Sequence, residues 1–167
     1  MVAALGRPER QQRYLDLLRE RVTALPWVEV VVVIGSLASG RADGVSDVDL
    51  LVGVHKGAFA AAWRDRERLR VTGALYGWDH WHDGSKGAGT HKWLTADAVL
   101  VEVLLGEATS GIRLAPPWRV LAGDPGAAGR WPPRPPIPRS ELSGSTDGLH
   151  PVEVAYDDFK ARLRAST

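Results

Sequence analysis

Two apolar runs joined by a short polar segment place the strongest constraint on what this chain can fold into. The first, VEVVVVIG, covers residues 28–35, and the second, SDVDLLVGV, covers residues 46–54 and opens with Asp47 and Asp49. Runs of this length that are rich in β-branched residues predict buried strands. Side chains two positions apart on a strand point to the same face, so both carboxylates can ligate one hard divalent cation.

A Gly-Ser pair, Gly35 and Ser36, follows the first of these runs. A turn from a strand into a helix start offers backbone N–H groups and a hydroxyl to an anion. A phosphate cradle combined with carboxylates that bind Mg²⁺ is what phosphoryl or nucleotidyl transfer requires. The alternative is an ordinary glycine-rich turn before an Asp-capped strand, because glycine and aspartate are common turn residues.

The two halves stand at a specific spacing: Gly35-Ser36, ten intervening residues, then Asp47-Val48-Asp49-Leu50. This pattern resembles the signature of the DNA polymerase β-like nucleotidyltransferase superfamily. The segment departs from the minimal, antitoxin-type members at Leu37 and Ser39, where those often carry arginine. The resemblance therefore leans toward the aminoglycoside and lincosamide nucleotidyltransferases.

The resemblance implies a reaction and a set of ligands. It implies transfer of a nucleoside monophosphate from an NTP to an acceptor hydroxyl, with release of pyrophosphate, and two Mg²⁺ ions, with Mn²⁺ as an alternative. Asp47 and Asp49 would hold the ions, and Gly35 and Ser36 would position the β- and γ-phosphates. The acceptor itself is open: antibiotic, sugar, protein side chain and RNA end all fit.

The family resemblance also implies a third carboxylate, from a later strand and beside the Asp pair. Residues 98–106 are apolar except for Glu102, and a carboxylate in a buried strand costs several kcal/mol unless a cation compensates it. A metal site would supply that cation, whereas an edge strand facing water or an arginine partner are the alternatives. Asp97 and Glu107 are the substitutes for this role. By the family resemblance, the third acid deprotonates the acceptor hydroxyl.

Three basic residues and a histidine cluster are further candidates. Arg41 and Lys92 are expected to contact triphosphate oxygens, the lysine as a point charge, and Lys86 is a weaker candidate of the same kind. The alternative for each is a solvated side chain with no specific contact. His80 and His82 share a strand face, a spacing compatible with zinc, with His91 as the one further ligand at hand. We expect instead a polar strand end without zinc.

The composition of the chain limits the kinds of partner that we expect. The chain of 167 residues has 21 basic and 20 acidic residues, a net charge of +1 and no cysteine. A dedicated nucleic-acid binder usually has a basic excess, so nucleic acid is a partner we do not favour. The N-terminal segment becomes charged too early for a secretory signal, and no apolar stretch reaches the length of a membrane span. We expect a cytoplasmic protein without a membrane partner.

The expected fold is α/β: a mixed twisted sheet with helices mainly on one face. Helices are expected at residues 8–25 and 57–71, a loop at 82–90, and strands at the ranges 74–81, 91–95 and 118–125 in addition to the apolar runs above. The domain prediction is a catalytic domain at 1–125, a linker arm rich in proline and glycine at 126–150, and a C-terminal helix at 151–167.

The C-terminal helix is expected at residues 151–165, with an apolar face formed by Val152, Tyr156, Phe159 and Leu163. We expect this face to dock on the catalytic domain, with a homodimer as the next possibility. A second functional hypothesis is a nucleotidyltransferase-fold protein that binds a helical partner, as antitoxin-like members of two-component systems do.

Overall fold

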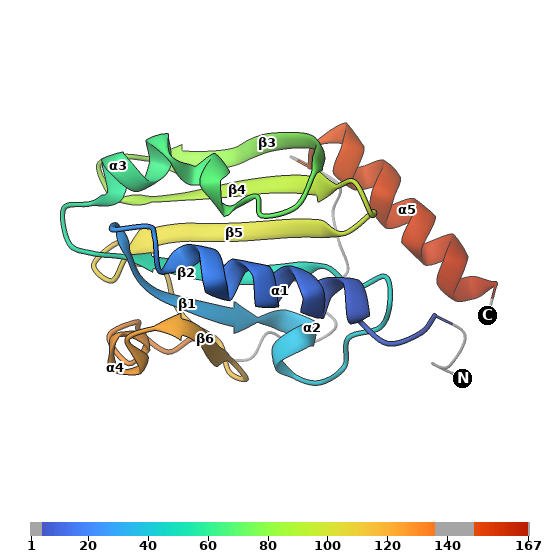
Figure 1. Ribbon diagram of the computed structural model, residues 1–167, viewed down its shortest axis with the longest axis horizontal. Coiled ribbons are helices and arrows are strands. Elements are labelled where there is room, and N and C mark those ends of the chain that lie inside the picture. Colours follow the sequence, from blue (N-terminus) through green and yellow to red (C-terminus); the bar gives the residue numbers. More distant parts are fainter. Residues whose placement is uncertain (1–4, 136–148, 167) are drawn as a thin grey trace.

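The computed structural model describes residues 5–135 and 149–166, and it shows an α/β fold built on one mixed sheet (Figure 1). The described residues form six strands in the order β3-β4-β5-β2-β1-β6. The strands are β1 (Val28–Ile34), β2 (Val48–Val54), β3 (Ala74–Asp83), β4 (Ala88–Thr95), β5 (Leu100–Glu107) and β6 (Arg119–Gly123). The helices are α1 (Glu9–Val22), α2 (Gly35–Ala38), α3 (Phe59–Arg64), α4 (Pro125–Ala128) and α5 (Pro151–Ala165), with a 3-10 turn, η2, at Arg66–Leu69.

The central pair of strands is parallel and all the others pair antiparallel. β2 pairs with β5 in parallel, whereas β1 pairs antiparallel with both β2 and β6, and β4 pairs antiparallel with both β3 and β5. Because β2 and β5 run in the same direction, their first residues meet at one end of the sheet. Asp49 of β2 and Glu102 of β5 lie near this end.

Alternation along the strands gives the sheet two different faces. One face packs against α1 and α3, and its buried residues include Tyr14, Leu15 and Leu18 from α1 and Phe59 and Ala62 from α3, with Val31, Val33, Leu50, Val52, Val101 and Val103 from the strands. The other face carries a smaller apolar cluster, in which Val30, Val32 and Leu51 pack against Trp131 and the two alanines of α4. Figure 1 shows α1 lying across the first face and α5 beyond one end of the strands.

The structure moves several predicted boundaries. The helix expected at residues 57–71 is divided into α3 and η2. The loop expected at 82–90 is a tight hairpin turn, because β3 continues to Asp83 and β4 already begins at Ala88. Oδ1 of Asp83 accepts the backbone N–H groups of Ser85 and Lys86, which closes the turn.

The C-terminal part of the chain is described only in portions. Residues 126–135 lie against the sheet, where Trp131 is 4% exposed, whereas residues 136–148 of the expected linker arm lie outside the described part. The predicted helix at 151–165 is confirmed as α5. In the parts of the chain at 5–135 and 149–166, no helix combines the length and apolar character needed to cross a bilayer.

Candidate active site

A row of side chains crosses the sheet on the face opposite α1. Asp49 on β2 is the direct neighbour of Glu102 on β5, and Glu102 is the direct neighbour of Lys92 on β4. Directly paired residues on adjacent strands point to the same side. We call Asp49, Glu102 and Lys92 the charged row. The predicted third acid therefore lies beside the Asp pair, because the parallel pairing of β2 with β5 aligns them.

Asp47 precedes β2, which begins at Val48. The prediction that both aspartates belong to the strand is therefore only half right. Asp47 still lies within electrostatic range of Glu102, because the Glu102 charge contributes to raising the Asp47 pKa. The two aspartates and Glu102 are thus brought together at one end of the sheet.

Gly35 lies directly against Asp49. Its φ is +68°, and a Cβ at this position would lie 2.5 Å from Oδ2 of Asp49. Ile34, the last residue of β1, is the register partner of Asp49, so the residue that follows it, Gly35, lies next to the Asp49 side chain. Only glycine satisfies both the backbone conformation and the close approach. The Gly-Ser turn and the carboxylate therefore share one small cavity of about 150 Å³, lined by Ile34, Gly35, Asp49, Leu50, Glu102 and Leu104.

The charged row is short of positive charge around Asp49. Burial, together with the negative charges of Glu102 and Asp47, raises the Asp49 pKa to about 7, although the charges of Lys160 and Lys92 oppose this rise. The Asp47 pKa is also raised, mainly by burial, although Lys160 opposes this. Carboxylates that lack sufficient compensating charge fit a divalent cation, which binds their ionised form.

Two buried lysines link the acids of the sheet to acids of α5. Nζ of Lys92 lies 2.8 Å from Oε2 of Glu102 and 2.8 Å from Oε1 of Glu153. The Lys92 side chain is 5% exposed. Because Lys92 is buried and paired, it is better placed to hold Glu102 than to make the predicted contact with the triphosphate.

The second lysine comes from the helix instead of the sheet. Nζ of Lys160 lies 2.6 Å from Oδ1 of Asp47 and 3.0 Å from Oδ1 of Asp157. The Lys160 side chain is 7% exposed. Lys92 thus joins Glu102 to Glu153 of α5, and Lys160 joins Asp47 to Asp157 of α5.

The face that α5 buries is polar, which corrects the sequence prediction. The residues of α5 that are buried are Glu153, Tyr156 and Lys160, whereas Phe159 is 52% exposed and Leu163 is 36% exposed. The helix begins at Pro151, with His150 as its N-cap accepting the N–H of Val152. Spacings of three, four and seven residues place Glu153, Tyr156, Asp157 and Lys160 on one side of the helix.

Sequence reasoning missed Lys160 and Glu153. The apolar spacing of Val152, Tyr156, Phe159 and Leu163 predicts an apolar docking face and gives no indication that these two charged residues are buried. The available signal was the spacing of Glu153, Asp157 and Lys160, three charged residues on the same helix side as Tyr156.

The other predicted site residues lie at different places. Arg41 is exposed, and its Nε donates to Oγ of Ser39, while its backbone N–H donates to the carbonyl of Ser36. Asp97, a substitute for the third acid, pairs with Arg13 at 2.6 Å. Glu107, the other substitute, lies at the far end of β5, where Oε1 accepts the N–H of Gly57.

The histidines of the hairpin are engaged in stacking and hydrogen bonding. His82 stacks on Trp63 with ring centroids 4.6 Å apart, and Nδ1 of His91 lies 2.7 Å from Oδ1 of Asp79. His80 falls where the register of β3 and β4 shifts, so it does not share a regular strand face with His82. Within residues 5–135 and 149–166, no three His, Asp or Glu side chains are arranged to hold a metal ion as they stand.

The acids of the charged row nevertheless fit a divalent cation. Their oxygens are hard donors, Gly35 leaves space directly against Oδ2 of Asp49, and the raised Asp49 pKa reports insufficient positive charge. In this structure the lysine ammonium groups of Lys160 and Lys92 contact oxygens of Asp47 and Glu102.

The comparisons with known proteins assign no relative. No protein-family model matches the chain, and a search of curated proteins gives no match either.

Proposed function

We propose that this chain is a metal-dependent nucleotidyltransferase that moves a nucleoside monophosphate from an NTP to an acceptor hydroxyl. The observation that carries the proposal is the row formed by Asp49 and Glu102, which lies directly against the Gly35 turn and leaves Asp49 with a pKa raised to about 7. A buried carboxylate held without sufficient compensating charge is costly, so its presence beside a glycine turn favours a functional site over a structural one.

The proposed ligands of the metal are Asp47, Asp49 and Glu102. Two Mg²⁺ ions bound there would neutralise triphosphate charge and lower the pKa of the acceptor hydroxyl. The backbone N–H groups of the Gly35-Ser36 turn and the Ser36 hydroxyl would position the outer phosphates. The exposed Arg41 side chain, five residues further along, is our candidate for a contact with the triphosphate.

Glu102 is the proposed proton acceptor. Lys92 holds Oε2 of Glu102, and the Glu102 side chain is 40% exposed, so solvent and substrate can reach it. The acceptor hydroxyl would lose its proton to Glu102 as its oxygen bonds to the α-phosphorus. The bond from the α-phosphorus to the bridging oxygen then breaks, and pyrophosphate leaves with that electron pair.

Incubation of the chain with Mg²⁺ and α-labelled NTPs, against a panel of hydroxyl compounds, cell lysate and total RNA, tests the proposal. We expect label transfer that falls by about a thousandfold in Asp49→Asn and Glu102→Gln, since both lose groups that act in the transition state. Glu107→Gln is the matched control, because Glu107 is an acid at the other end of the same strand. Equal transfer by all three variants and the parent chain would refute the site assignment.

A further inference from the structure

Helix α5 places a positive charge beside Asp47, one of the proposed metal ligands. The Lys160 ammonium lies 2.6 Å from Oδ1 of Asp47, and it also lies 4.7 Å from the centre of the Tyr156 ring. A lysine buried to this degree keeps its charge because carboxylates surround it. The ammonium therefore occupies a cation position at one of the proposed ligands.

The remaining contacts of α5 with the rest of the described chain are both polar and apolar. The Tyr156 hydroxyl donates to the carbonyl of Ala98 at 2.6 Å, and its ring belongs to a small apolar cluster with Trp78 and Leu100. Nε of Arg164 lies 3.1 Å from Oδ2 of Asp43. The ion pairs of Glu153, Lys160 and Arg164 therefore act together with this cluster to keep α5 at the end of the sheet.

The two lysines belong to different kinds of element, a strand and a helix. Lys92 belongs to β4, an interior strand, so the sheet fixes its backbone and it can leave Glu102 only by rotation of its own side chain. Lys160 belongs to α5, which Figure 1 shows beyond the strand ends, so it can leave Asp47 by movement of a helix or of its own side chain. An incoming cation would meet the Lys160 ammonium as a like charge within a few ångströms, where repulsion is strong in a partly buried site.

We infer that Lys160 competes with a divalent cation for Asp47, so that binding of the cation releases Lys160 and loosens the hold of α5 on the sheet. The inference rests on the proposed metal site and adds a built-in competitor to it. Lys160 sets the affinity of that site in the free protein, and α5 reports whether the site is loaded.

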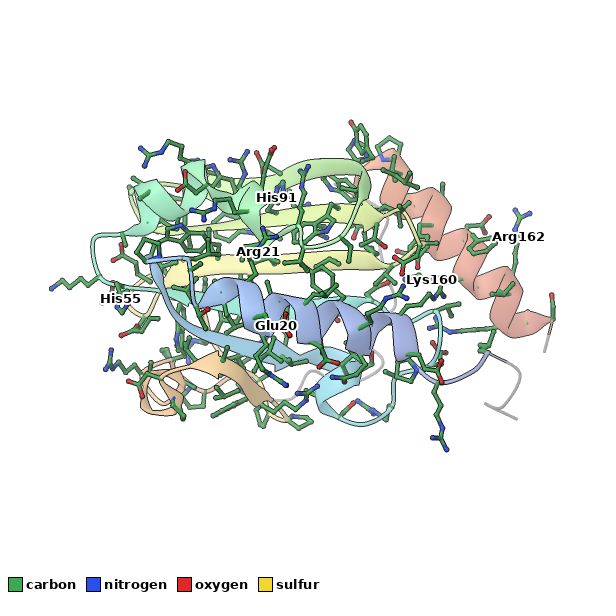
Figure 2. All side chains as sticks on the ribbon, viewed as in Figure 1. Glu20, Arg21, His55, His91, Lys160 and Arg162 are labelled. Atoms are coloured by element: carbon green, nitrogen blue, oxygen red, sulfur yellow. The ribbon has the colours of Figure 1, made fainter. Side chains whose placement is uncertain are left out.

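A titration of the full-length chain with Mn²⁺ alone, with free ion measured by electron paramagnetic resonance, tests the competition. Lys160→Met removes the competing ammonium and should bind Mn²⁺ about tenfold more tightly than the parent chain, the effect of one close charge on a carboxylate. Arg162→Met is the matched control, since it removes one positive charge from the same helix. The Arg162 side chain is 79% exposed and pairs with Asp158. Figure 2 shows Lys160 on the side of α5 toward the sheet and Arg162 on the outer side.

Amide hydrogen exchange of residues 151–165 supplies a readout that does not depend on activity. Mn²⁺ should speed exchange in α5 of the parent chain, whereas in Lys160→Met exchange should be fast with and without the ion. Circular dichroism checks that the variant is folded. If Lys160→Met fails to fold, Lys160→Gln keeps a hydrogen-bond donor without the charge and carries the same expectation.

The possible outcomes distinguish a failure of the inferred competition from a failure of the proposed metal site. Equal Mn²⁺ affinity in the parent chain and in the Lys160 variant overturns the competition but leaves the metal site standing. A gain of the same size in Arg162→Met shows general charge attraction and also overturns the competition. Absence of Mn²⁺ binding in all three proteins refutes the proposed metal site, and the inference with it.

Discussion

The two faces of the sheet differ in the side chains that they bury. The face against α1 is apolar, with Val31, Leu50 and Val101 fully or almost fully buried. The opposite face carries the charged row, in which burial and like charges raise the Asp49 pKa to about 7. The opposite face also has an apolar cluster around Trp131, and the charged row lies beside it at a cost in stability that the apolar packing offsets. The proposed function is our explanation for this difference.

The largest loss of stability should come from a change at the interior lysine, Lys92. Lys92→Met leaves Glu102 and Glu153 as neighbouring carboxylates without their shared cation, and Glu153 is 8% exposed. Breaking a buried ion pair by removing one partner costs about 3 kcal/mol or more. We expect the free energy of unfolding in urea to fall by this amount, and to fall less in Lys160→Met, whose partner Asp47 is 27% exposed. The reverse order of the two losses would show that α5, and not β4, carries the main ionic support.

Neutralising Asp49 should change the stability in the opposite direction. Asp49 has a folded-state pKa of about 7, above its ordinary value of 3.8. A carboxyl with a raised pKa binds its proton more tightly in the folded state, so its ionisation destabilises the fold as the pH rises from about 4 to about 7. The free energy of unfolding of Asp49→Asn at pH 8 should therefore exceed that of the parent chain by up to about 4 kcal/mol.

The pH dependence separates this effect from a change in packing. Urea titrations at several pH values should show the parent chain losing stability relative to Asp49→Asn between pH 4 and 7, with no further change above that window. A difference that stays constant from pH 4 to pH 8 would mean that the Asp49 charge is not the cause.

Gly35 should tolerate no side chain. Gly35→Ala would place Cβ 2.5 Å from Oδ2 of Asp49 at a φ of +68°. The strain of this backbone conformation and the clash together should cost about 2 kcal/mol and displace the carboxylate. Gly40, with a φ of +71° and open space around it, is the matched control, since Gly40→Ala has the backbone strain without the clash. Equal melting temperatures for the two variants would show that the close approach to Asp49 has no consequence.

The smallest effect should distinguish the two sides of α5. Tyr156→Phe removes the hydrogen bond to Ala98 and should lower the free energy of unfolding by about 1 kcal/mol. Phe159→Ala, on the exposed side, should change it by less than about 0.5 kcal/mol. Thermal melts of both variants check this. A larger loss in Phe159→Ala would mean that this side of α5 packs against a partner.

Much of the fold follows from local sequence patterns. The β-branched runs at β1 and β2 and the helical spacing in α1 and α5 predict those elements because each side chain pattern matches its own period. The neighbourhood of Asp49 and Glu102 was predicted through the family resemblance. Its physical cause, the parallel pairing of β2 with β5, joins residues more than fifty positions apart and cannot be read from local periodicity.

The charged contacts of α5 were not predictable in the same way. Lys160 and Asp47 are separated by 113 positions, and a lysine in an amphipathic helix ordinarily faces water. Its burial depends on where α5 docks. Likewise, Lys92 looks like a free phosphate-binding charge in sequence, because only the sheet register reveals that Glu102 is its direct neighbour.

The central claim is that Asp49 and its neighbours form a site for a divalent cation and a nucleotide. The most direct test is the melting temperature of the parent chain and of Asp49→Asn with Mg²⁺ and each NTP in turn. A ligand at a hundredfold excess over its dissociation constant adds about 2.7 kcal/mol, which raises the melting temperature of a domain of this size by roughly 5 °C or more. We predict such a rise with at least one NTP in the parent chain and none in Asp49→Asn. An equal rise in both proteins, or no rise in the parent chain, would contradict the account.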